Sequence, residues 1–386
     1  MQRTILVVGA GFAGATYART LAEAGWQVRV IDRRHHVAGN AFDEVLPSGT
    51  RVHRYGPHLF HTSNEPVFAW LKKFSDFVPY EHKVQAELPG GLCVPLPINR
   101  QTINAVFDVD LGDPECVGAF LAARAVRNSN PTSAADYLNS RIGPQLTDLF
   151  FRPYTRKMWA LDLEDLDAAV VRRIPLRLDD ETRYFPDDIF QALPRDGYTH
   201  LVEAILDHAL IRTDLGRVFE HDMLDQYEHC FNSMAIDEFF GSKLGPLPYR
   251  SIRFHHVLVP ADYRRGSAAT VNFTDDGPIT RETDWSRLPY HGPATADKRI
   301  ITREEPCDYR DNGLERYYPV KAADGRFDAI YESYRLMARR IPKVTFIGRC
   351  GTYRYLDMHQ AIAAALSDFR KKVVPFWARR RDCVAV

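Results

Sequence analysis

The first forty residues alternate between short apolar runs and breaks rich in glycine or charge. Residues 4–8 read TILVV, a β-branched and apolar run that predicts a buried strand. Residues 15–25, ATYARTLAEAG, have a helical pattern, and residues 27–32, QVRVID, form a second apolar run that ends in an acid. The order strand, glycine turn, helix, strand predicts the first half of a Rossmann-like α/β domain.

The turn before the helix reads Gly-Ala-Gly-Phe-Ala-Gly. Gly9 permits the tight turn, Gly11 lets the backbone approach a pyrophosphate, and Gly14 lets the helix pack closely on the strand. The helix N-terminus offers free N–H groups to an anion, and Asp32, about twenty residues on, is placed to accept hydrogen bonds from ribose hydroxyls. The residues predicted to contact a dinucleotide are Gly9, Gly11, Phe12, Gly14 and Asp32.

The rest of the chain divides into segments of different periodicity. Residues 100–160 have a mostly helical pattern, whereas short alternating runs such as RSIRFHHVLV and AATVNFT favour an antiparallel sheet. A late strand, KVTFIGRCG at 343–351, precedes a helix whose predicted N-cap is Asp357. The predicted units are a discontinuous Rossmann-like domain of residues 1–80, 200–240 and 315–386, a helical domain of residues 100–160, and an antiparallel-sheet domain of residues 80–100, 160–200 and 240–315.

The composition is that of a globular enzyme without a general affinity for nucleic acid. The chain has 386 residues, 45% of them apolar and 26% charged, which suits two or three packed units. Lysine and arginine together number 50, as do aspartate and glutamate, so the formal net charge is zero. A nucleic-acid binder usually has a basic excess, whereas one polyanionic small ligand needs only a local basic cluster. The balance favours a nucleotide over a nucleic acid.

A local cluster of aromatic and basic residues lies at the end of the helical segment. Residues 149–159 read LFFRPYTRKMW, and RRIPLR follows at 172–177. Aromatic faces stack on bases and guanidinium groups bind phosphates, so the mixture fits a nucleotide site. The alternatives are a purely structural role for the rings in a core and a solvated basic face for the arginines.

The six cysteines form no CxxC pair, and no histidine cluster accompanies them at zinc spacing. We interpret them as reduced thiols of a cytoplasmic protein without a metal site. The N-terminus has no signal-peptide pattern, and no window approaches about eighteen apolar residues, so we expect no membrane insertion.

The segment after Asp32 resembles FAD-binding Rossmann proteins of the glutathione-reductase type. Those proteins often continue with an arginine and then Gly-Gly; here Arg33 is followed by Ala38-Gly39 and Asn40. The late strand, Gly-Arg turn and helix at 343–366 are also typical of that class, in which such a unit returns to the first domain and covers the flavin. The resemblance implies FAD as the cofactor.

Nine ordered segments span nearly the whole chain: HRYGPHLFHT (53–62), LPIN (96–99), PYTRKMW (153–159), RRIPLR (172–177), GYTHL (197–201), PYRSIRF (248–254), VNFTD (271–275), RYYPV (316–320) and YRYLDMHQAIAAAL (353–366). Together they resemble the UDP-galactopyranose mutase family. Members of that family interconvert UDP-galactopyranose and UDP-galactofuranose through attack of reduced FAD, by its N5 atom, on the anomeric carbon. The resemblance implies the same isomerase activity, a UDP-sugar substrate, and a homodimer.

The resemblance also implies roles for individual residues. Arg173 and Arg281 match arginines that flank the diphosphate, and His58, with His61, matches a histidine loop beside flavin and sugar. The catalytic candidates are Arg173, Arg281 and His58. The substrate-binding candidates are Phe150, Tyr154 and Trp159 at the uracil and ribose, Tyr184, Tyr317 and Tyr355 at the diphosphate, and Arg250 and Asp357. The cofactor-binding candidates are Gly9, Gly11, Phe12, Gly14, Asp32, Arg33, Asn40, His58, Arg349, Asp357 and Met358.

Several positions depart from the family pattern, among them Pro153, which stands for a glycine, and Ala160 after Trp159. Ala38 stands for a glycine, Ser233-Met234-Ala235 for Thr-Gly-Pro, His82 for an asparagine and Leu356 for a tyrosine. These departures surround the flavin and the sugar, so UDP-N-acetylgalactosamine or a dTDP-linked deoxy sugar is an alternative substrate. Two further alternatives are an FAD-dependent oxidoreductase of the same fold and a nucleotide-sugar or redox sensor without catalysis.

Overall fold

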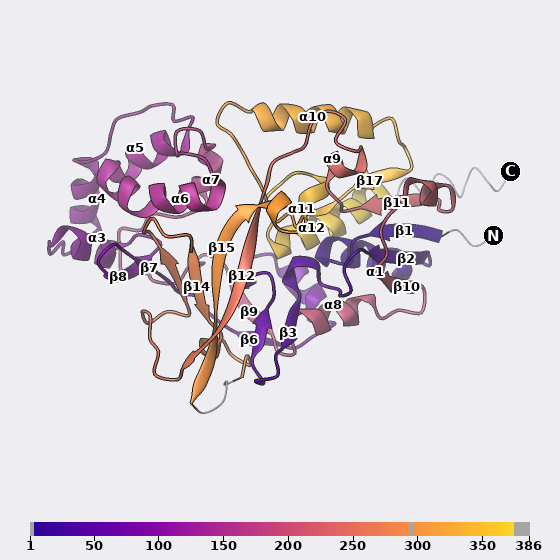
Figure 1. Ribbon diagram of the computed structural model, residues 1–386, viewed down its shortest axis with the longest axis horizontal. Helices are drawn as coiled ribbons and strands as arrows, with labels where there is room; N and C mark the ends of the chain where they lie inside the picture. The colour runs from indigo at the N-terminus through magenta and orange to yellow at the C-terminus, as the bar shows by residue number, and fades with distance from the viewer. Residues whose placement is uncertain (1–3, 293–296, 374–386) are drawn as a thin grey trace.

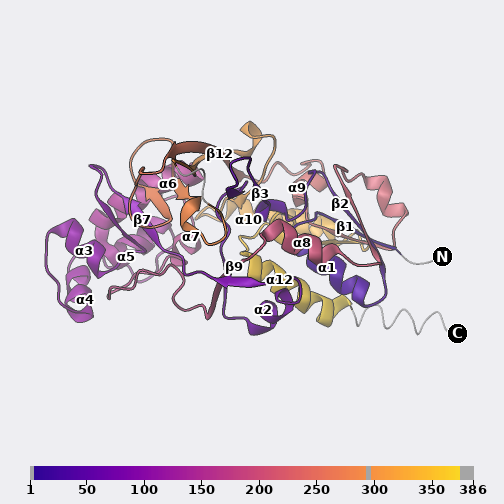
Figure 2. The same ribbon diagram turned by 90° about the horizontal axis from the view of Figure 1, so that it is seen from below.

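The computed structural model describes residues 4–292 and 297–373, so the basic end of the chain and Cys383 lie outside the described residues. The molecule is elongated, with a parallel sheet and its helices at one end and a cluster of helices at the other (Figure 1). Long antiparallel strands run between the two ends, and the same succession is visible from below (Figure 2). The fold is a Rossmann-like α/β domain with additional sheets and helices, which confirms the predicted fold class.

Five parallel strands form the Rossmann sheet. In spatial order they are β10 (Ile211–Leu215), β2 (Gln27–Asp32), β1 (Thr4–Val8), β11 (His229–Asn232) and β17 (Val344–Phe346). One face packs on α1 (Phe12–Glu23), α8 (Tyr198–Leu206) and α12 (Met358–Asp368), and the other on η3 (His221–Asp225) and α9 (Ile236–Phe239). Because both faces are covered, Ile5, Leu6 and Val7 of the central strand have no solvent exposure.

The glycine turn between β1 and α1 has the geometry that its sequence predicts. Gly9 has a φ of +101°, and a Cβ there would lie 1.9 Å from the Ser233 Oγ. A Cβ on Gly14 would lie 1.9 Å from the Gly9 carbonyl oxygen, so the helix approaches the strand at a distance that only glycine allows. Asp32 closes the unit, because its carboxylate accepts the Ala10 backbone N–H at 2.8 Å.

A second sheet of seven strands crosses the middle of the molecule. In spatial order its strands are β16 (Tyr318–Pro319), β12 (Tyr249–Pro260), β15 (Lys298–Asp308), β14 (Arg281–Asp284), β13 (Thr270–Phe273), β7 (Val84–Glu87) and β8 (Cys93–Leu96). Neighbouring strands are antiparallel except β13 and β7, which are parallel. The predicted antiparallel sheet therefore contains one parallel pair, whose strands lie far apart in the chain and are not joined by a hairpin.

Two small sheets complete the strands. A hairpin joins β3 (Asp43–Val45) and β4 (Arg51–His53), and β5 (Phe60–Thr62), β9 (Phe190–Pro194) and β6 (Phe77–Pro79) form a three-stranded sheet. Thus β9 pairs outside the seven-stranded sheet, although residues 160–200 are predicted to belong to the antiparallel-sheet domain. Conversely, β16 joins the seven-stranded sheet from within residues 315–386. The predicted domain boundaries stay a prediction.

Residues 100–160 are mostly helical. They form α3 (Arg100–Phe107), α4 (Pro114–Ala122), α5 (Ala134–Leu146), the π-helical turn η2 (Thr147–Phe151) and α6 (Arg152–Trp159), and α7 (Ala168–Arg172) follows. Ser133 and Asp136 form a capping box at the start of α5, and Gly143, with a φ of +77°, and Pro144 break its end. The remaining helices are η1 (Gly39–Ala41), α2 (Glu65–Leu71), η4 (Trp285–Arg287), η5 (Tyr309–Asp311), α10 (Arg326–Ala338), α11 (Gly348–Gly351) and η6 (Phe369–Val373).

Residues 4–292 and 297–373 contain neither a membrane-spanning helix nor a cluster of metal-binding side chains. None of the helices there combines the length and apolar character needed to cross a bilayer. The same residues bring together no group of three or more His, Cys, Asp or Glu side chains suited to a metal ion. The free cysteines are Cys93, Cys116, Cys230, Cys307 and Cys350.

Candidate functional site

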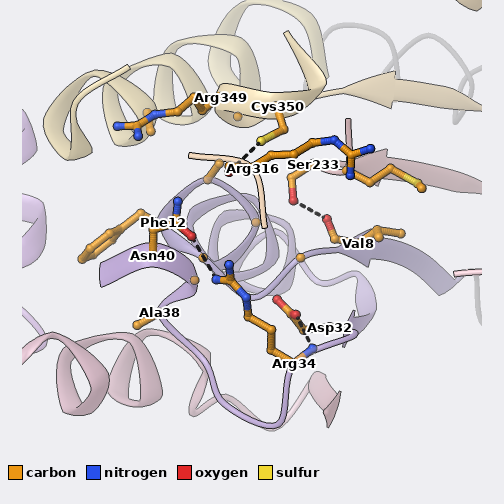
Figure 3. Close-up of a pocket in the computed structure, with 18 of the residues that line it drawn as sticks. Val8, Phe12, Asp32, Arg34, Ala38, Asn40, Ser233, Arg316, Arg349 and Cys350 are labelled. Atoms are coloured by element: carbon orange, nitrogen blue, oxygen red, sulfur yellow. Dashed lines mark hydrogen bonds between the residues drawn. The ribbon is translucent and has the colours of Figure 1, made fainter. Parts of the chain in front are cut away.

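The first of two adjoining cavities lies at the carboxyl end of the Rossmann strands. It has a volume of about 280 Å³. Val8, Asp32, Ser233 and Gly348, which end or follow four adjacent parallel strands, all line it, and the first three are drawn in Figure 3. In open α/β sheets, ligands bind at this edge, beyond the carboxyl ends of the strands.

One end of the first cavity is built around Asp32. Its two carboxylate oxygens accept the backbone N–H groups of Ala10 and Arg34, at 2.8 and 2.9 Å. The Arg34 side chain donates to the Asn40 Oδ1 at 3.0 Å (Figure 3), and it also pairs with Glu315. These contacts fix the orientation of Asp32 and leave each of its oxygens a further lone pair for a ligand hydroxyl.

Arginines dominate the charge of the first cavity. Its lining includes five arginines and three acids, a formal charge of +2. Arg316 and Arg33 both pair with Glu238, at 2.6 and 3.6 Å, so one acid holds two of the cations. A cavity with this charge suits a ligand that carries a diphosphate.

The second cavity has a volume of about 390 Å³ and lies between the helical cluster and the seven-stranded sheet. His58, Arg349, Asp357 and Met358 line both cavities, so they form the junction between them. Asp357 is the N-cap of α12, as predicted, and its backbone N–H donates to the Gln360 Oε1 at 3.0 Å. The junction is therefore fixed by the start of a helix.

His58 is a neutral imidazole at the junction. Burial lowers its pKa to about 4, so the ring is uncharged at neutral pH. The Nδ1 atom lies 2.8 Å from the Gly56 carbonyl oxygen, which can only accept, so Nδ1 carries the proton. The Nε2 atom is left as a hydrogen-bond acceptor.

Arg281, on β14, is held from three sides. Its Nε donates to the Asn272 Oδ1 at 3.1 Å, and one Nη atom donates to the Tyr154 hydroxyl at 3.4 Å. The other Nη atom lies 3.7 Å from the Glu304 carboxylate. Burial raises the pKa of Glu304, while the charge of Arg281 lowers it. The protein thus sets the orientation of this guanidinium group before any ligand arrives.

Arg173, directly after α7, stacks on a pair of tyrosines. Its guanidinium carbon lies 3.9 Å from the centroid of the Tyr355 ring, which in turn stacks on Tyr318 with centroids 5.5 Å apart. Burial raises the pKa of Tyr184, and Arg173 and Arg281 both lower it. The Tyr184 hydroxyl therefore lies within electrostatic reach of both arginines.

The lining of the second cavity is also cationic. Arg173, Arg281 and Arg349 against Asp357 leave a formal charge of +2. His58 and His82 add no charge at neutral pH, because burial lowers their pKa values to about 4 and about 3. A dianionic ligand matches this charge.

The aromatic and basic stretch at residues 149–159 serves both the core and the cavity. Phe150, Tyr154 and Trp159 line the second cavity, and Phe150 and Trp159 are also buried in the core of the helical cluster. The two arginines among them are outside the lining: Arg152 pairs with Glu164 at 2.9 Å, and Arg156 with Asp162 at 2.5 Å. Here the rings form the cavity wall, and the cations come from elsewhere in the chain.

Comparison with known proteins identifies the family. The family model of UDP-galactopyranose mutase matches residues 149–355, and that of an NAD(P)-binding Rossmann-like domain matches residues 7–74. A probable UDP-galactopyranose mutase of Klebsiella pneumoniae is 35% identical over 368 residues, which are 95% of this chain and 93% of that protein. The chain belongs to the UDP-galactopyranose mutase family. It is therefore an enzyme, an isomerase by class.

Other members of the mutase family and related structures bear on the fold and the substrate. A dTDP-fucopyranose mutase of Escherichia coli is also 35% identical, over 372 residues that are 94% of this chain and 96% of that protein. The crystal structure of a reduced UDP-galactopyranose mutase matches with a TM-score of 0.71 at 16% identity, covering 95% of each chain. The structural likeness confirms the fold. Relatives named for different nucleotide sugars are equally identical to this chain, so the comparisons do not select the substrate.

Most of the residues predicted from the mutase resemblance line the two cavities, and the roles of all of them stay predictions. All eleven cofactor candidates line the first cavity: Gly9, Gly11, Phe12, Gly14, Asp32, Arg33, Asn40, His58, Arg349, Asp357 and Met358. The candidates that line the second cavity are His58, Phe150, Tyr154, Trp159, Arg173, Tyr184, Arg281, Tyr355 and Asp357.

Arg250 is a mutase candidate that lines neither cavity. Its Nε donates to the Met158 carbonyl oxygen at 2.9 Å, and one Nη atom donates to that of Lys157 at 3.3 Å. These carbonyls belong to the last turn of α6, where backbone acceptors lack helical partners. In this structure Arg250 holds the helix end that carries Trp159, and its role in binding substrate stays a prediction.

Tyr317 also lines neither cavity, and its neighbour Tyr318 lines the second. Successive side chains of an extended chain point to opposite sides, so only one of the two tyrosines can face the cavity. The Tyr317 ring packs beside Phe254, with centroids 5.9 Å apart, and its carbonyl oxygen accepts from Arg349 at 3.0 Å. The sequence could not say which tyrosine points inward.

Several residues of the second cavity escaped the sequence reasoning as site residues. Phe185 stacks on His61 with centroids 3.5 Å apart, and His359 lies edge-on to His61 at 5.1 Å. The sequence marks His82 as a departure from the mutase pattern and does not indicate that it lines a site. Phe185 and His359 directly follow the candidates Tyr184 and Met358 in the sequence, and this adjacency is the signal that could have identified them. Among the lining residues that were not predicted are Tyr318, His82, Phe185 and His359.

Proposed function

We propose that this chain interconverts UDP-galactopyranose and UDP-galactofuranose, with reduced FAD bound in the first cavity. The observation that carries the proposal is the pair of adjoining cavities that share His58, Arg349, Asp357 and Met358. The redox-active end of a dinucleotide bound in the first cavity would lie at this junction. The sugar of a nucleotide sugar bound in the second cavity would lie at the same junction.

The first cavity fits FAD on two further observations. Gly11 lines it and has no side chain, so the backbone at the start of α1 is open to a pyrophosphate. Arg316, also in the lining, has a buried Nε without a hydrogen-bond partner in the described part of the chain. When bound, reduced FAD supplies the nucleophile that displaces UDP from the anomeric carbon, and the conversion involves no net oxidation.

Holding UDP is the main task of the chain's own residues, because UDP must leave the sugar, stay in place and return. Arg173 and Arg281 offer planar cations that can bond two phosphate oxygens each, and the hydroxyls of Tyr184 and Tyr355 add neutral donors. Burial opposes the charge of Arg281, but Glu304 and the neighbouring tyrosines hold its pKa above the usual value. Both cations are thus in place when negative charge develops on the leaving diphosphate.

The uracil would bind against the rings of the aromatic stretch. Phe150 and Tyr154 are four residues apart and both line the cavity, as does Trp159 at the end of α6. Stacking of one base on such rings is worth roughly 1–3 kcal/mol.

His58 is proposed as a hydrogen-bond acceptor at the junction. A pKa of about 4 makes its imidazole a weak base at neutral pH, so removal of a proton from substrate is not its task. Its Nε2 can instead accept from a hydroxyl of the sugar or from an N–H of the cofactor. No acid–base pair is needed for the ring exchange as proposed.

A dTDP-linked deoxy sugar is the second candidate substrate. A relative named dTDP-fucopyranose mutase is as similar to this chain as the relative named for UDP-galactopyranose. Six positions that depart from the family pattern also line the cavities: His82 lines the second, and Ala38, Ser233, Met234, Ala235 and Leu356 line the first. These side chains are therefore placed to alter which sugar is accepted.

The test is turnover of UDP-galactofuranose by the purified, FAD-loaded protein with and without dithionite, read by separating the two nucleotide sugars. Conversion to the pyranose only under reduction supports the proposal. Conversion of dTDP-fucofuranose or UDP-N-acetylgalactosamine in its place would select the alternative sugar. Reduction of the flavin by substrate, without isomerisation, would mark an oxidoreductase and overturn the proposal. The homodimer and the cytoplasmic location stay predictions.

A further inference from the structure

Three histidines from separate parts of the chain form one hydrogen-bonded series that ends at the junction of the cavities. His53 closes β4, His58 lies in the loop that follows, and His291 lies in the loop after η4. The His58 backbone N–H donates to the His53 Nδ1 at 2.9 Å, and the His53 Nε2 lies 3.0 Å from the His291 Nε2. At the far end, the His291 Nδ1 lies 2.9 Å from the Pro289 carbonyl oxygen.

The contacts at the two ends determine where each proton sits. A backbone N–H can only donate, so the His53 Nδ1 accepts and the proton of that ring is on Nε2. A backbone carbonyl can only accept, so the His291 proton is on Nδ1 and its Nε2 is an acceptor. The two independent assignments are complementary at the 3.0 Å contact, where the His53 Nε2–H donates to the His291 Nε2.

The rings of His53 and His291 are held in place by packing. His53 is 1% exposed and His291 is 3% exposed. Trp285 contacts both, with ring centroids 4.9 Å from His53 and 5.7 Å from His291. The His291 carbonyl oxygen also accepts the Arg51 backbone N–H at 2.8 Å, which ties its loop to β4. The series therefore connects two rigid elements.

The electrostatic surroundings keep the rings neutral. Burial lowers the pKa of His53 well below the usual value, with His291, His58 and Arg51 acting in the same direction. Burial also lowers the pKa of His291 to about 4; Arg51 opposes its proton, and the Pro289 carbonyl and Asp43 favour it. Tyr198 lies edge-on to His53 at 5.4 Å.

The Asp43 carboxylate is already engaged, since its oxygens accept the backbone N–H groups of Tyr198 and Thr199 at 2.9 and 2.8 Å. A proton on His291 would place two N–H groups face to face at the 3.0 Å contact, and a second proton on His53 would place its Nδ1–H against the His58 backbone N–H. The series is consequently intact only while both rings are neutral.

We propose that His53 and His291 are positioning residues that, by holding the His58 backbone amide, place the His58 imidazole at the junction of the two cavities. The loop has little freedom on its other side, because Gly56, at a φ of +82°, lies against Phe254 so closely that a Cβ would be 2.9 Å from that ring. The inference rests on the proposed function, in which the junction is the reacting site. According to this inference, the loop holds the Nε2 acceptor of His58 in a fixed position.

Paired variants separate the hydrogen bonds from the packing. His291→Gln keeps an acceptor for the His53 N–H, whereas His291→Phe keeps a ring and removes the acceptor. His53→Asn keeps an acceptor near the Nδ1 position, whereas His53→Phe removes it. Two quantities are measured: hydrogen exchange of the His58 amide, by mass spectrometry of peptides that end on either side of it, and kcat and KM for UDP-galactofuranose under dithionite.

We expect the His58 amide to exchange about tenfold faster in both Phe variants, the loss of one hydrogen bond, and to stay protected in the Gln and Asn variants. The kcat should fall in the same order, with little change in KM, because the diphosphate arginines are untouched. Equal exchange of the His58 amide in His291→Gln and His291→Phe would overturn the proposal. If His53→Phe does not fold, the comparison of these two His291 variants still tests the proposal. The expected exchange order without turnover in any protein, wild type included, would support the positioning and overturn the proposed function.

Discussion

Arg281 and Glu304 face each other across adjacent antiparallel strands, with a guanidinium nitrogen 3.7 Å from a carboxylate oxygen. Arg281 lines the second cavity and Glu304 does not, so the acid lies behind the cation. Glu304 is 3% exposed, and its Oε1 has no hydrogen-bond partner in the described residues, so the contact is ionic. The acid stabilises the charge of Arg281 without occupying the donors that would meet a ligand.

Replacing Glu304 by glutamine removes this countercharge and keeps the side-chain shape. We expect Glu304→Gln to lower the melting temperature by several degrees, because a largely buried arginine loses its partner. UDP should then raise the melting temperature more than it does in the wild type, since the diphosphate replaces the missing charge. Thermal unfolding with and without UDP measures both effects.

The control for Glu304 is Glu282→Gln. Glu282 is also a buried acid in the seven-stranded sheet, but it pairs with Arg303 at 2.9 Å and lines neither cavity. This variant should lose stability without gaining any response to UDP. An identical response to UDP in all three proteins would contradict the assigned role of Glu304.

Arg281→Ala should lower turnover of UDP-galactofuranose by about 10²–10³-fold, the usual effect of removing a transition-state donor, while FAD stays bound. FAD retention follows because Arg281 does not line the first cavity. Arg264→Ala is the matched control, since that guanidinium is exposed and donates within its own loop. Turnover is measured under dithionite and bound FAD by its absorbance. Normal turnover in Arg281→Ala would exclude it from the reaction.

Tyr317 and Tyr318 offer a pair of single-atom changes in adjacent residues. Tyr318→Phe removes a hydroxyl from the second cavity, and we expect UDP to bind roughly two- to tenfold more weakly, as for one lost hydrogen bond. Tyr317→Phe should leave UDP affinity unchanged, because that ring lies outside both cavities. Calorimetric titration of UDP into each protein measures the difference. The reverse order would restore Tyr317 as the ligand contact.

Stability should decrease as the pH is lowered from about 6.5 to 4.5. Burial lowers the pKa of His58 and His291 to about 4 and that of His82 to about 3, whereas an unfolded histidine titrates near 6.5. In this window the unfolded chain binds protons that the folded chain does not, which favours unfolding. Above about pH 7 both states are neutral at these positions, so the dependence disappears.

Urea unfolding at several pH values measures this dependence on pH. His291→Gln should reduce the slope between pH 6.5 and 4.5, because one of the contributing histidines is gone. Equal stability at pH 7.5 and 5 in the wild type would show that these histidines take up protons in the folded state.

The dinucleotide unit was predictable from the sequence because each of its parts depends on a few neighbouring residues. The apolar run at 4–8 predicts a buried strand, and the glycines at 9, 11 and 14 permit a turn that no other residue allows at Gly9 or Gly14. The Asp357 cap follows from its place before an apolar helical segment. Most candidates for the second cavity came from segments that resemble a family. Such segments indicate which residue types occupy a site, but they do not show in which direction each side chain points.

The sequence by itself determined the Rossmann unit and the family, and most of the site residues predicted from it line the two cavities, because these follow from local pattern and from similarity along the chain. Only the tertiary structure decided that Tyr318 rather than Tyr317 lines the cavity, that Arg250 caps α6, and that Glu304 lies behind Arg281. It alone joined His53 to His291, 238 residues apart. The physical reason is that strand register and chain crossings set which distant side chains meet, and neither is written in the neighbouring residues.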